Sequence, residues 1–156
     1  MADLVVTLTE AVTLNGTSRG STNTLTIAGV DDVFHRIVTC PANVDTTVAK
    51  FRENTSQTDG ALDLEDTKYI RVTNMDSSNP INLSLQVSND EDGAADFSST
   101  ILIEPKKSFI MGSPHDGIQV SDTNATIITT LVDLESIMID PGANAVQVEV
   151  FIAAVV

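Results

Sequence analysis

Apolar and polar residues alternate with a period of two along much of the chain. In residues 81–87, INLSLQV, four apolar residues fall on one face and three polar residues on the other. That pattern is typical of a strand with one buried face. Residues 68–74 alternate as well, and the turn-forming sequence MDSSNP of residues 75–80 joins the two runs. We therefore predict that 68–74 and 81–87 form an antiparallel hairpin.

Similar short runs fill the rest of the chain and predict an all-β protein. In residues 145–152 the apolar face holds Val146, Val148, Val150 and Ile152. A short helix at 92–97 or 135–139 is the best helical alternative. With turn signals about every eight to twelve residues and no linker, we expect one sandwich or barrel domain over residues 1–156. The other predicted strands are residues 4–9, 23–27, 33–39, 46–51, 99–104, 108–111, 117–120, 125–132 and 134–139.

Composition supports the same fold class. The 156-residue chain holds 17 Val, 13 Ile and 19 Thr, and these β-branched residues suit a pleated surface. Hydrophobic residues make up 42% of the sequence, which is enough to form a core. Because Cys40 is the single cysteine, an internal disulfide and a cysteine-based zinc site are excluded. We interpret Cys40 as a small buried apolar residue.

Charge narrows the choice of partners. Eight Lys and Arg against 22 Asp and Glu give a net charge of -14 at pH 7, a sign that repels nucleic acid and anionic lipid. Aromatic residues make up 4% and Trp is absent, which removes the usual platforms for stacking bases or sugars. The sequence has no apolar run of about 18 residues and no basic leader of a secretory signal. We expect neither nucleic acid nor a membrane as partner.

Candidate catalytic groups are sparse. His35 lies inside a predicted strand, where we interpret it as a surface residue, and His115 precedes Asp116 in the turn SPHDG. The sequence holds neither a G-x-S-x-G nucleophile motif nor a phosphate-binding glycine loop. We therefore predict no enzyme, no catalytic residue and no cofactor. A pocket that joined His115, Asp116 and a serine would favour a hydrolase instead.

One acidic stretch, SNDEDGAAD at residues 88–96, is a candidate ligand site. Its spacing partly matches the middle of an EF-hand loop, but serines stand where the first Asp and the last Glu of that loop belong. We interpret the stretch as a solvated acidic turn and predict no metal site. Calcium bound by Asp90, Asp92 and Asp96 is the alternative.

Several features predict assembly into an oligomer. Threonines at positions 22, 24 and 26 can hydrogen-bond across a flat interface. The adjacent pair Lys106-Lys107 is predicted to form a hairpin turn, and residues 53–66 are the longest stretch without an apolar pattern. We expect that stretch at a subunit contact, together with six further residues: Leu4, Val5, Lys106, Lys107, Val155 and Val156.

Five segments follow one another along the chain: LTEAVTLNG at residues 8–16, TLTIAGV at 24–30, HRIV at 35–38, YIRVTN at 69–74 and EPKK at 104–107. Their order is similar to that of small structural proteins in the virions of tailed bacteriophages, especially marine ones. This resemblance implies an antiparallel β-sandwich that is jelly-roll-like. It also implies a role in the virion and no enzymatic residues.

On this resemblance we expect a non-enzymatic capsid decoration or cement protein. It would be made in the host cytoplasm and would stabilise contacts of the major capsid protein on the outer head surface. We expect a homo-oligomer, with a trimer favoured, because cyclic symmetry multiplies weak contacts. The negative charge suits an exterior position away from packaged DNA. A tail, neck or fibre component is the alternative, and a glycan-binding module is a more remote one.

Overall fold

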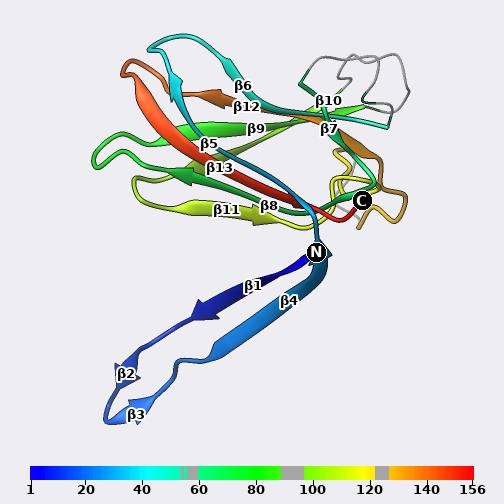
Figure 1. Cartoon of the computed structure of the whole chain (residues 1–156). Coiled ribbons are helices and arrows are strands. Elements are labelled where there is room, and N and C mark those ends of the chain that lie inside the picture. Colours follow the sequence, from blue (N-terminus) through cyan, green and yellow to red (C-terminus); the bar gives the residue numbers. More distant parts are fainter. Residues whose placement is uncertain (54, 56–59, 89–96, 122–126) are drawn as a thin grey trace.

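The computed structural model describes residues 1–53, 55, 60–88, 97–121 and 127–156, and these contain β-strands but no α-helix. The strands form a two-sheet sandwich and a separate ribbon that projects away from it (Figure 1). The predicted all-β fold class is therefore confirmed.

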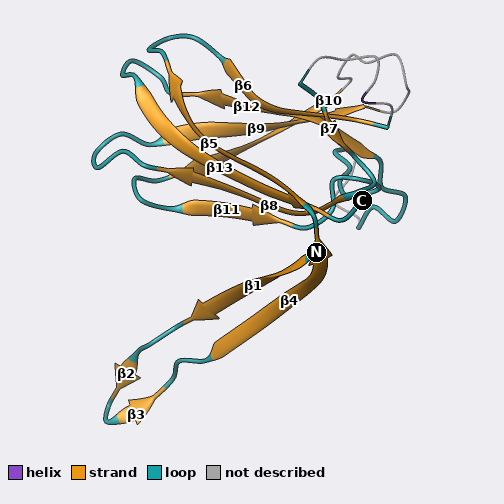
Figure 2. Cartoon of the chain, viewed as in Figure 1, coloured by secondary structure: helices purple, strands orange, loops and turns teal. Residues whose placement is uncertain are grey.

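Two sheets face each other in the sandwich (Figure 2). Every pairing within them is antiparallel except the short parallel contact between β7 and β6. The five-stranded sheet has the order β10 (Phe97–Ile103), β9 (Ile81–Ser88), β12 (Asp133–Asp140), β6 (Thr46–Arg52) and β7 (Leu62–Asp63). The four-stranded sheet has the order β11 (Ser108–Met111), β8 (Thr67–Asn74), β13 (Val146–Ala154) and β5 (Asp32–Cys40).

The connectivity of the sandwich is that of a jelly roll. With β7 set aside, the first strand pairs with the last, β5 with β13, and the second with the second last, β6 with β12. The inner pairs continue the series as β8 with β11 and β9 with β10. This is the pattern of one long hairpin rolled into two facing sheets. The predicted antiparallel, jelly-roll-like sandwich is confirmed.

The core lies between the two sheets and consists of the alternating apolar residues that the sequence pattern marks. Ile81, Leu83, Leu85 and Val87 of β9 are at most 2% exposed. From the other sheet, Val146, Val148, Val150 and Ile152 of β13 are equally buried. Complete burial of one such side chain contributes about 1.5–3 kcal/mol, so these facing strands supply much of the stability of the sandwich.

The hairpin predicted on either side of residues 75–80 is wrong. β8 and β9 lie in opposite sheets, and residues 75–80 carry the chain from one sheet to the other. The fully buried Asn74 side chain supports this crossing. It donates to the carbonyl oxygens of Asn79 and Ile103 at 2.9 and 3.2 Å, and it accepts the backbone N–H of Asp76 at 2.9 Å. A buried amide satisfied in this way stabilises the crossing instead of a tight turn.

Lys106 and Lys107 also lie in a crossing and not in the predicted hairpin turn. Residues 104–107 connect β10 in the five-stranded sheet to β11 in the four-stranded sheet. The two crossings bond to each other, because the N–H of Lys106 donates to the Asn74 carbonyl at 3.1 Å and the N–H of Asn74 donates to the Lys107 carbonyl at 3.0 Å. Hydrophobic alternation is the same for a strand in either sheet, so it could not distinguish a hairpin from a crossing.

Smaller predictions about individual segments also differ from the structure. Residues 135–139 belong to β12, whose backbone is hydrogen-bonded on both sides, so the helix proposed there is wrong. The other helix candidate, 92–97, lies outside the described residues except for Phe97, which begins β10. Residues 117–120 and the described part of 125–132 contribute one isolated bridge instead of two strands.

Residues 60–66, the end of the stretch 53–66, pack against the sandwich. Leu62 lies in β7 beside the end of β6, and Leu64 is 2% exposed in the core. The backbone N–H of Leu64 donates to the carbonyl of Arg52 at 3.2 Å. Leu62 therefore belongs to a strand of only two residues, which is too short to produce a periodic pattern in the sequence.

Candidate functional site

The ribbon that projects from the sandwich is the most distinctive surface of the molecule (Figure 1). In it, β1 (Ala2–Thr9) pairs antiparallel with β4 (Thr22–Val30). The two-residue strands β2 (Thr13–Leu14) and β3 (Thr17–Ser18) form its far end. We call residues 1–30 the arm. The chain enters the sandwich directly after β4, so the arm is anchored where the edge strand β5 begins.

The far end of the arm is closed by a tight turn and a close backbone contact. Asn15 and Gly16 have φ values of 52° and 77°, the conformation of two-residue hairpin turns that favour Asn-Gly. Farther back, a Cβ on Gly20 would lie 1.9 Å from the carbonyl oxygen of Glu10. Only glycine allows the two segments of the arm to approach at that point.

The register of β1 against β4 divides the arm into two faces. Residues opposite each other in an antiparallel pair share a face. Leu4 pairs with Ile27 and Val6 with Leu25, which makes one face apolar. The other face carries Val5 and the threonines at positions 7, 9, 22, 24 and 26. The arm is therefore an amphipathic ribbon.

The sandwich covers only the root of the apolar face. Three apolar residues near the root pack against a small cluster of Val30, Tyr69 and Ala153. A two-stranded ribbon without a covering layer is marginally stable in water, so the outer half of the arm lacks the packing that stabilises the rest of the chain. Three apolar residues there are more than half exposed, Leu8, Val12 and Leu14, and so is Leu25 nearer the root.

The arm and the sandwich also differ in charge. Of the 22 acidic residues two lie in the arm and 20 outside it, and of the eight basic residues one lies in the arm and seven outside it. The arm is thus close to neutral, whereas residues 31–156 carry most of the negative charge. The charged residues of the arm are Asp3 near its root, Glu10, which accepts a hydrogen bond from the Ser21 hydroxyl at 2.7 Å, and Arg19.

The six residues predicted at subunit contacts fall into two groups. Leu4 and Val155 pack at the root of the arm, while Val5 and Val156 are 57% and 83% exposed. Lys106 and Lys107 lie at the other end of β8, beside Asn74, and the ammonium of Lys106 donates to the Met75 carbonyl. The structure therefore brings together the predicted residues from the two ends of the chain and leaves the lysines apart from them.

An ionic network lies on the outer face of the four-stranded sheet. Glu149 on β13 accepts hydrogen bonds from Arg71 at 2.7 Å and from the Nε2 of His35 at 2.8 Å. These two hydrogen bonds hold the pKa of Glu149 below its ordinary value. His35 is half exposed and its ring lies 5.7 Å from that of Phe151. The network links β5, β13 and β8 across one surface.

A second cluster of titratable groups surrounds His115. Its Nδ1 lies 3.3 Å from Oδ1 of Asp133, and its Nε2 lies 3.4 Å from Oδ2 of Asp116. Glu53, directly after β6, places a carboxylate oxygen in the same group. A serine hydrolase needs one imidazole nitrogen free to face the serine. Both nitrogens of His115 face carboxylates, and Ser113 accepts the backbone N–H of His115 instead.

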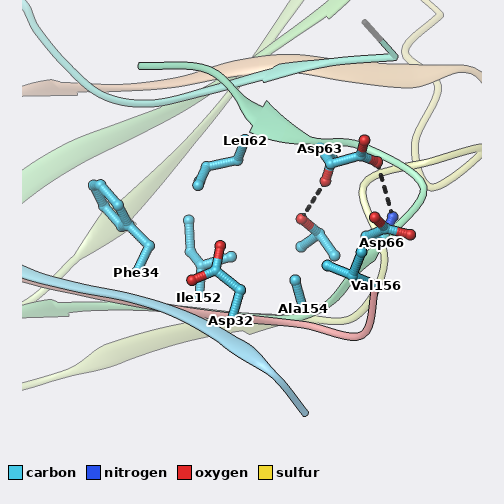
Figure 3. Close-up of a pocket in the computed structure, with 9 residues that line it drawn as sticks. Asp32, Phe34, Leu62, Asp63, Asp66, Ile152, Ala154 and Val156 are labelled. Carbon is cyan, nitrogen blue, oxygen red and sulfur yellow. Dashed lines mark hydrogen bonds between the residues drawn. The ribbon is translucent and has the colours of Figure 1, made fainter. Parts of the chain in front are cut away.

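A small hollow opens at the root of the arm, between the two sheets (Figure 3). Its volume is about 40 Å³, whereas sites for small molecules occupy roughly 300–1,000 Å³. Asp63 is held by its neighbours, because its Oδ1 accepts the N–H of Asp66 at 3.1 Å and its carbonyl accepts the Thr67 hydroxyl at 2.6 Å. The hollow has room for water and not for a sugar.

The two remaining candidates from the sequence are the acidic stretch 88–96 and the single cysteine, Cys40. Asp90, Asp92 and Asp96, the alternative calcium ligands, lie outside the described residues. Cys40 is completely buried at the end of β5, and desolvation raises the pKa of its thiol. A buried thiol with a raised pKa is a poor nucleophile. Its position agrees with our interpretation of a small apolar core residue.

Sequence reasoning missed the grouping of Glu53, His115 and Asp133. These residues are far apart in the chain and follow no ligand motif, so their spacing carried no signal. The strands of the arm were predicted from residues 4–9 and 23–27. Their isolation from the sandwich was not, because a covered and an uncovered strand show the same alternation.

The fold and the described surfaces define a jelly-roll β-sandwich that carries an amphipathic β-ribbon. Among the described residues, no helix has the length and apolar character needed to cross a membrane. The chain matches no family model, no curated protein and no solved structure.

Proposed function

We propose that this chain is a non-enzymatic structural protein of a phage virion, and that it decorates the outer head surface as a homo-oligomer. The observation that carries the proposal is the arm, an amphipathic ribbon whose outer apolar residues have no cover from their own chain. A protein that holds such a ribbon away from its core is suited to assembly.

A second copy of the chain is the occupant that we assign to the arm. Two sandwiches repel each other, because residues 31–156 contain 20 acidic and seven basic residues. The near-neutral arm avoids this repulsion, and Arg19 at its far end is attracted to an acidic neighbour. Burial of the outer apolar residues against that neighbour supplies the hydrophobic contribution. A cyclic arrangement, with a trimer favoured, lets each copy give and receive one arm.

Fold and charge support the virion role by analogy. Jelly rolls occur in viral capsid proteins and in lectins, and one fold serves many functions. The strongly negative sandwich suits the exterior of a capsid, where it is kept away from packaged DNA. Contact with the major capsid protein would add interface area between capsid subunits. The head location is the first choice, and a tail, neck or fibre position is the alternative.

A glycan-binding module is the second candidate from another class. The jelly-roll fold favours it, since lectins share this architecture. Against it, the hollow at the arm root is too small for a sugar ring, and the chain has no Trp and a single Tyr, Tyr69, which is 5% exposed. Stacking on an exposed aromatic ring is the usual basis of sugar recognition.

Light scattering on the purified chain tests the role of the arm. We expect a closed oligomer, which the double substitution Leu8→Ser and Leu25→Ser converts to a folded monomer. Ile110→Ser is the matched control, because Ile110 is 51% exposed but lies on β11 of the sandwich. A wild-type monomer at high concentration, or an oligomer unaffected by the arm substitutions, contradicts the assignment of a second copy.

Immunogold electron microscopy tests the location. Antibodies against the recombinant chain are applied to particles of the phage that encodes it. Label over the head surface supports the decoration role. Label confined to the tail or neck supports the alternative component, and particles without label contradict a virion role altogether.

A further inference from the structure

The geometry points to a site for a single transition-metal ion of the zinc type, with Glu53, His115 and Asp133 as ligands. One donor atom from each of these residues lies within 4.8 Å of the other two. In a tetrahedral zinc site the metal–ligand bonds are about 2.0–2.2 Å long. The three donor atoms therefore need to move about 1 Å closer to one another when the ion binds. This inference does not depend on the proposed virion role.

The three ligands come from separate parts of the fold. Glu53 follows the end of β6, His115 lies in the connection between β11 and β12, and Asp133 begins β12. Glu53 is exposed, which leaves its side chain free to turn toward an ion. An ion bound here would join the connection to the end of the five-stranded sheet.

Histidine 115 is oriented as a metal ligand. Its Nδ1 is buried and, among the described residues, has no hydrogen-bond partner, although Asp133 lies 3.3 Å away. Its other nitrogen, Nε2, faces the Asp116 carboxylate at 3.4 Å. Metal-bound histidines commonly direct their second nitrogen at a carboxylate, which fixes the ring and raises its basicity. Asp116 occupies that supporting position.

The loop that carries His115 is held in place before any ion binds. The backbone N–H of Asp116 donates to Oδ1 of Asp133 at 2.7 Å, which orients the second ligand. Asp116 has a positive φ of 46°, and a Cβ on Gly117 would lie 2.5 Å from the Ser113 carbonyl. Backbone bonds from Gly117 to Val132 fix the loop against the start of β12.

Charge and donor type indicate which ion fits. Three carboxylates, from Glu53, Asp116 and Asp133, surround one imidazole, so the cluster is negative even when His115 carries a proton. Arg52, the neighbouring cation in sequence, pairs with Glu135. Calcium and magnesium prefer oxygen donors only, whereas an imidazole with carboxylates suits zinc. Three protein ligands leave a fourth position open for water.

Calorimetric titration of the tag-free, chelator-treated chain with Zn²⁺ is the test. We expect one tight site per chain, and a rise in the melting temperature of about 5 °C when zinc is in hundred-fold excess over its Kd. His115→Ala and Asp133→Asn should remove the site. Asp116→Asn should weaken binding by about 10- to 100-fold, as for other supporting carboxylates.

Two matched variants make the test decisive. His35→Ala removes the other histidine–carboxylate pair, which lies on the outer sheet face, and it should leave zinc binding unchanged. Glu53→Gln changes an exposed ligand without a risk to folding, and it should weaken binding by about 10-fold or more. The proposal is overturned if the chain binds no zinc at a Zn²⁺ concentration of about 100 μM. It is also overturned if the His115→Ala and Glu53→Gln variants bind zinc as tightly as the wild type. Equal affinity for Ca²⁺ at the same site overturns the choice of ion.

Discussion

Strand β9 in the sandwich and strand β1 in the arm both carry apolar residues at every second position, yet they differ in cover. The apolar residues of β9 are at most 2% exposed, whereas Leu8, at the outer end of the apolar face of β1, is 54% exposed. β9 has a neighbour strand on each side and a sheet across the core, while β1 has only β4. The comparison shows that alternation makes a strand, and that packing partners decide whether it stabilises the fold or remains available for assembly.

Matched Leu→Ala substitutions in the two regions give the largest expected contrast. Leu83→Ala in β9 should lower the free energy of unfolding by about 3–5 kcal/mol, since it removes a fully buried side chain and leaves a cavity. Leu25→Ala in the arm should change it by less than about 0.5 kcal/mol. Urea unfolding of dilute, monomeric protein measures both values. A large loss for Leu25→Ala would show that the arm packs on its own sandwich after all.

Substitution of Asn74 tests how much the crossings between the sheets contribute to the free energy of unfolding. Asn74→Ala leaves the carbonyls of Asn79 and Ile103 without their buried donor, so we expect a loss of about 2 kcal/mol. Asn82→Ala is the control, because Asn82 is exposed and its side-chain amide donates to Asp140 at the long distance of 3.4 Å. Similar unfolding free energies for the two variants would contradict the role given to Asn74.

Gly20→Ala should disturb the arm alone. The new Cβ would meet the Glu10 carbonyl oxygen at 1.9 Å, so the far end of the arm must separate while the sandwich keeps its stability. Hydrogen exchange should show faster exchange in residues 10–21 and no change in β9 or β13. Gly112→Ala is the control, since no atom lies within 4 Å of a Cβ there. Protection unchanged in residues 10–21 would contradict the close contact.

The smallest expected effect is the pH dependence that Glu149 contributes. Its pKa is lowered in the folded state by hydrogen bonds from Arg71 and His35. The stability from this group is therefore present above the ordinary value of 4.5 and is lost as pH falls through the lower folded pKa. When the free energy of unfolding is measured by urea titration at a series of pH values, Glu149→Gln should flatten its decrease at acid pH (the acid limb). Gln147→Ala on the same strand should leave that decrease unchanged. If the acid limb is unchanged in Glu149→Gln, the hydrogen bonds of Glu149 do not contribute to the pH dependence of stability.

Much of the sandwich could be predicted from the sequence because its strands are buried on one face. The alternation in residues 81–87 and 145–152 identified β9 and β13 and their inward residues correctly. The interior of the jelly roll is apolar, so a central strand such as β9 or β13 shows a period of two. The placement of β8 and β9 in opposite sheets could not be predicted, because a buried amide at Asn74 and not a turn motif supports the crossing of the chain.

The candidate sites were less accessible to sequence reasoning. Residues 4–9 and 23–27 were predicted as strands, but no local feature indicated that they would leave the sandwich together. Glu53, His115 and Asp133 meet only because β6 and β12 are neighbours in one sheet and because the loop after β11 returns to the start of β12. Contacts between such distant residues arise from the topology and leave no periodic pattern.

The sequence by itself determined the fold class, the inward face of most strands and the negative charge of the molecule. Those properties depend on residue type and on a period of two, and both are local. Only the tertiary structure decided which strands pair, that the near-neutral arm stands apart from an acidic sandwich, and that His115 faces two carboxylates. Those properties depend on which buried polar groups find partners and on which surfaces remain uncovered, and both are fixed only when the whole chain has packed.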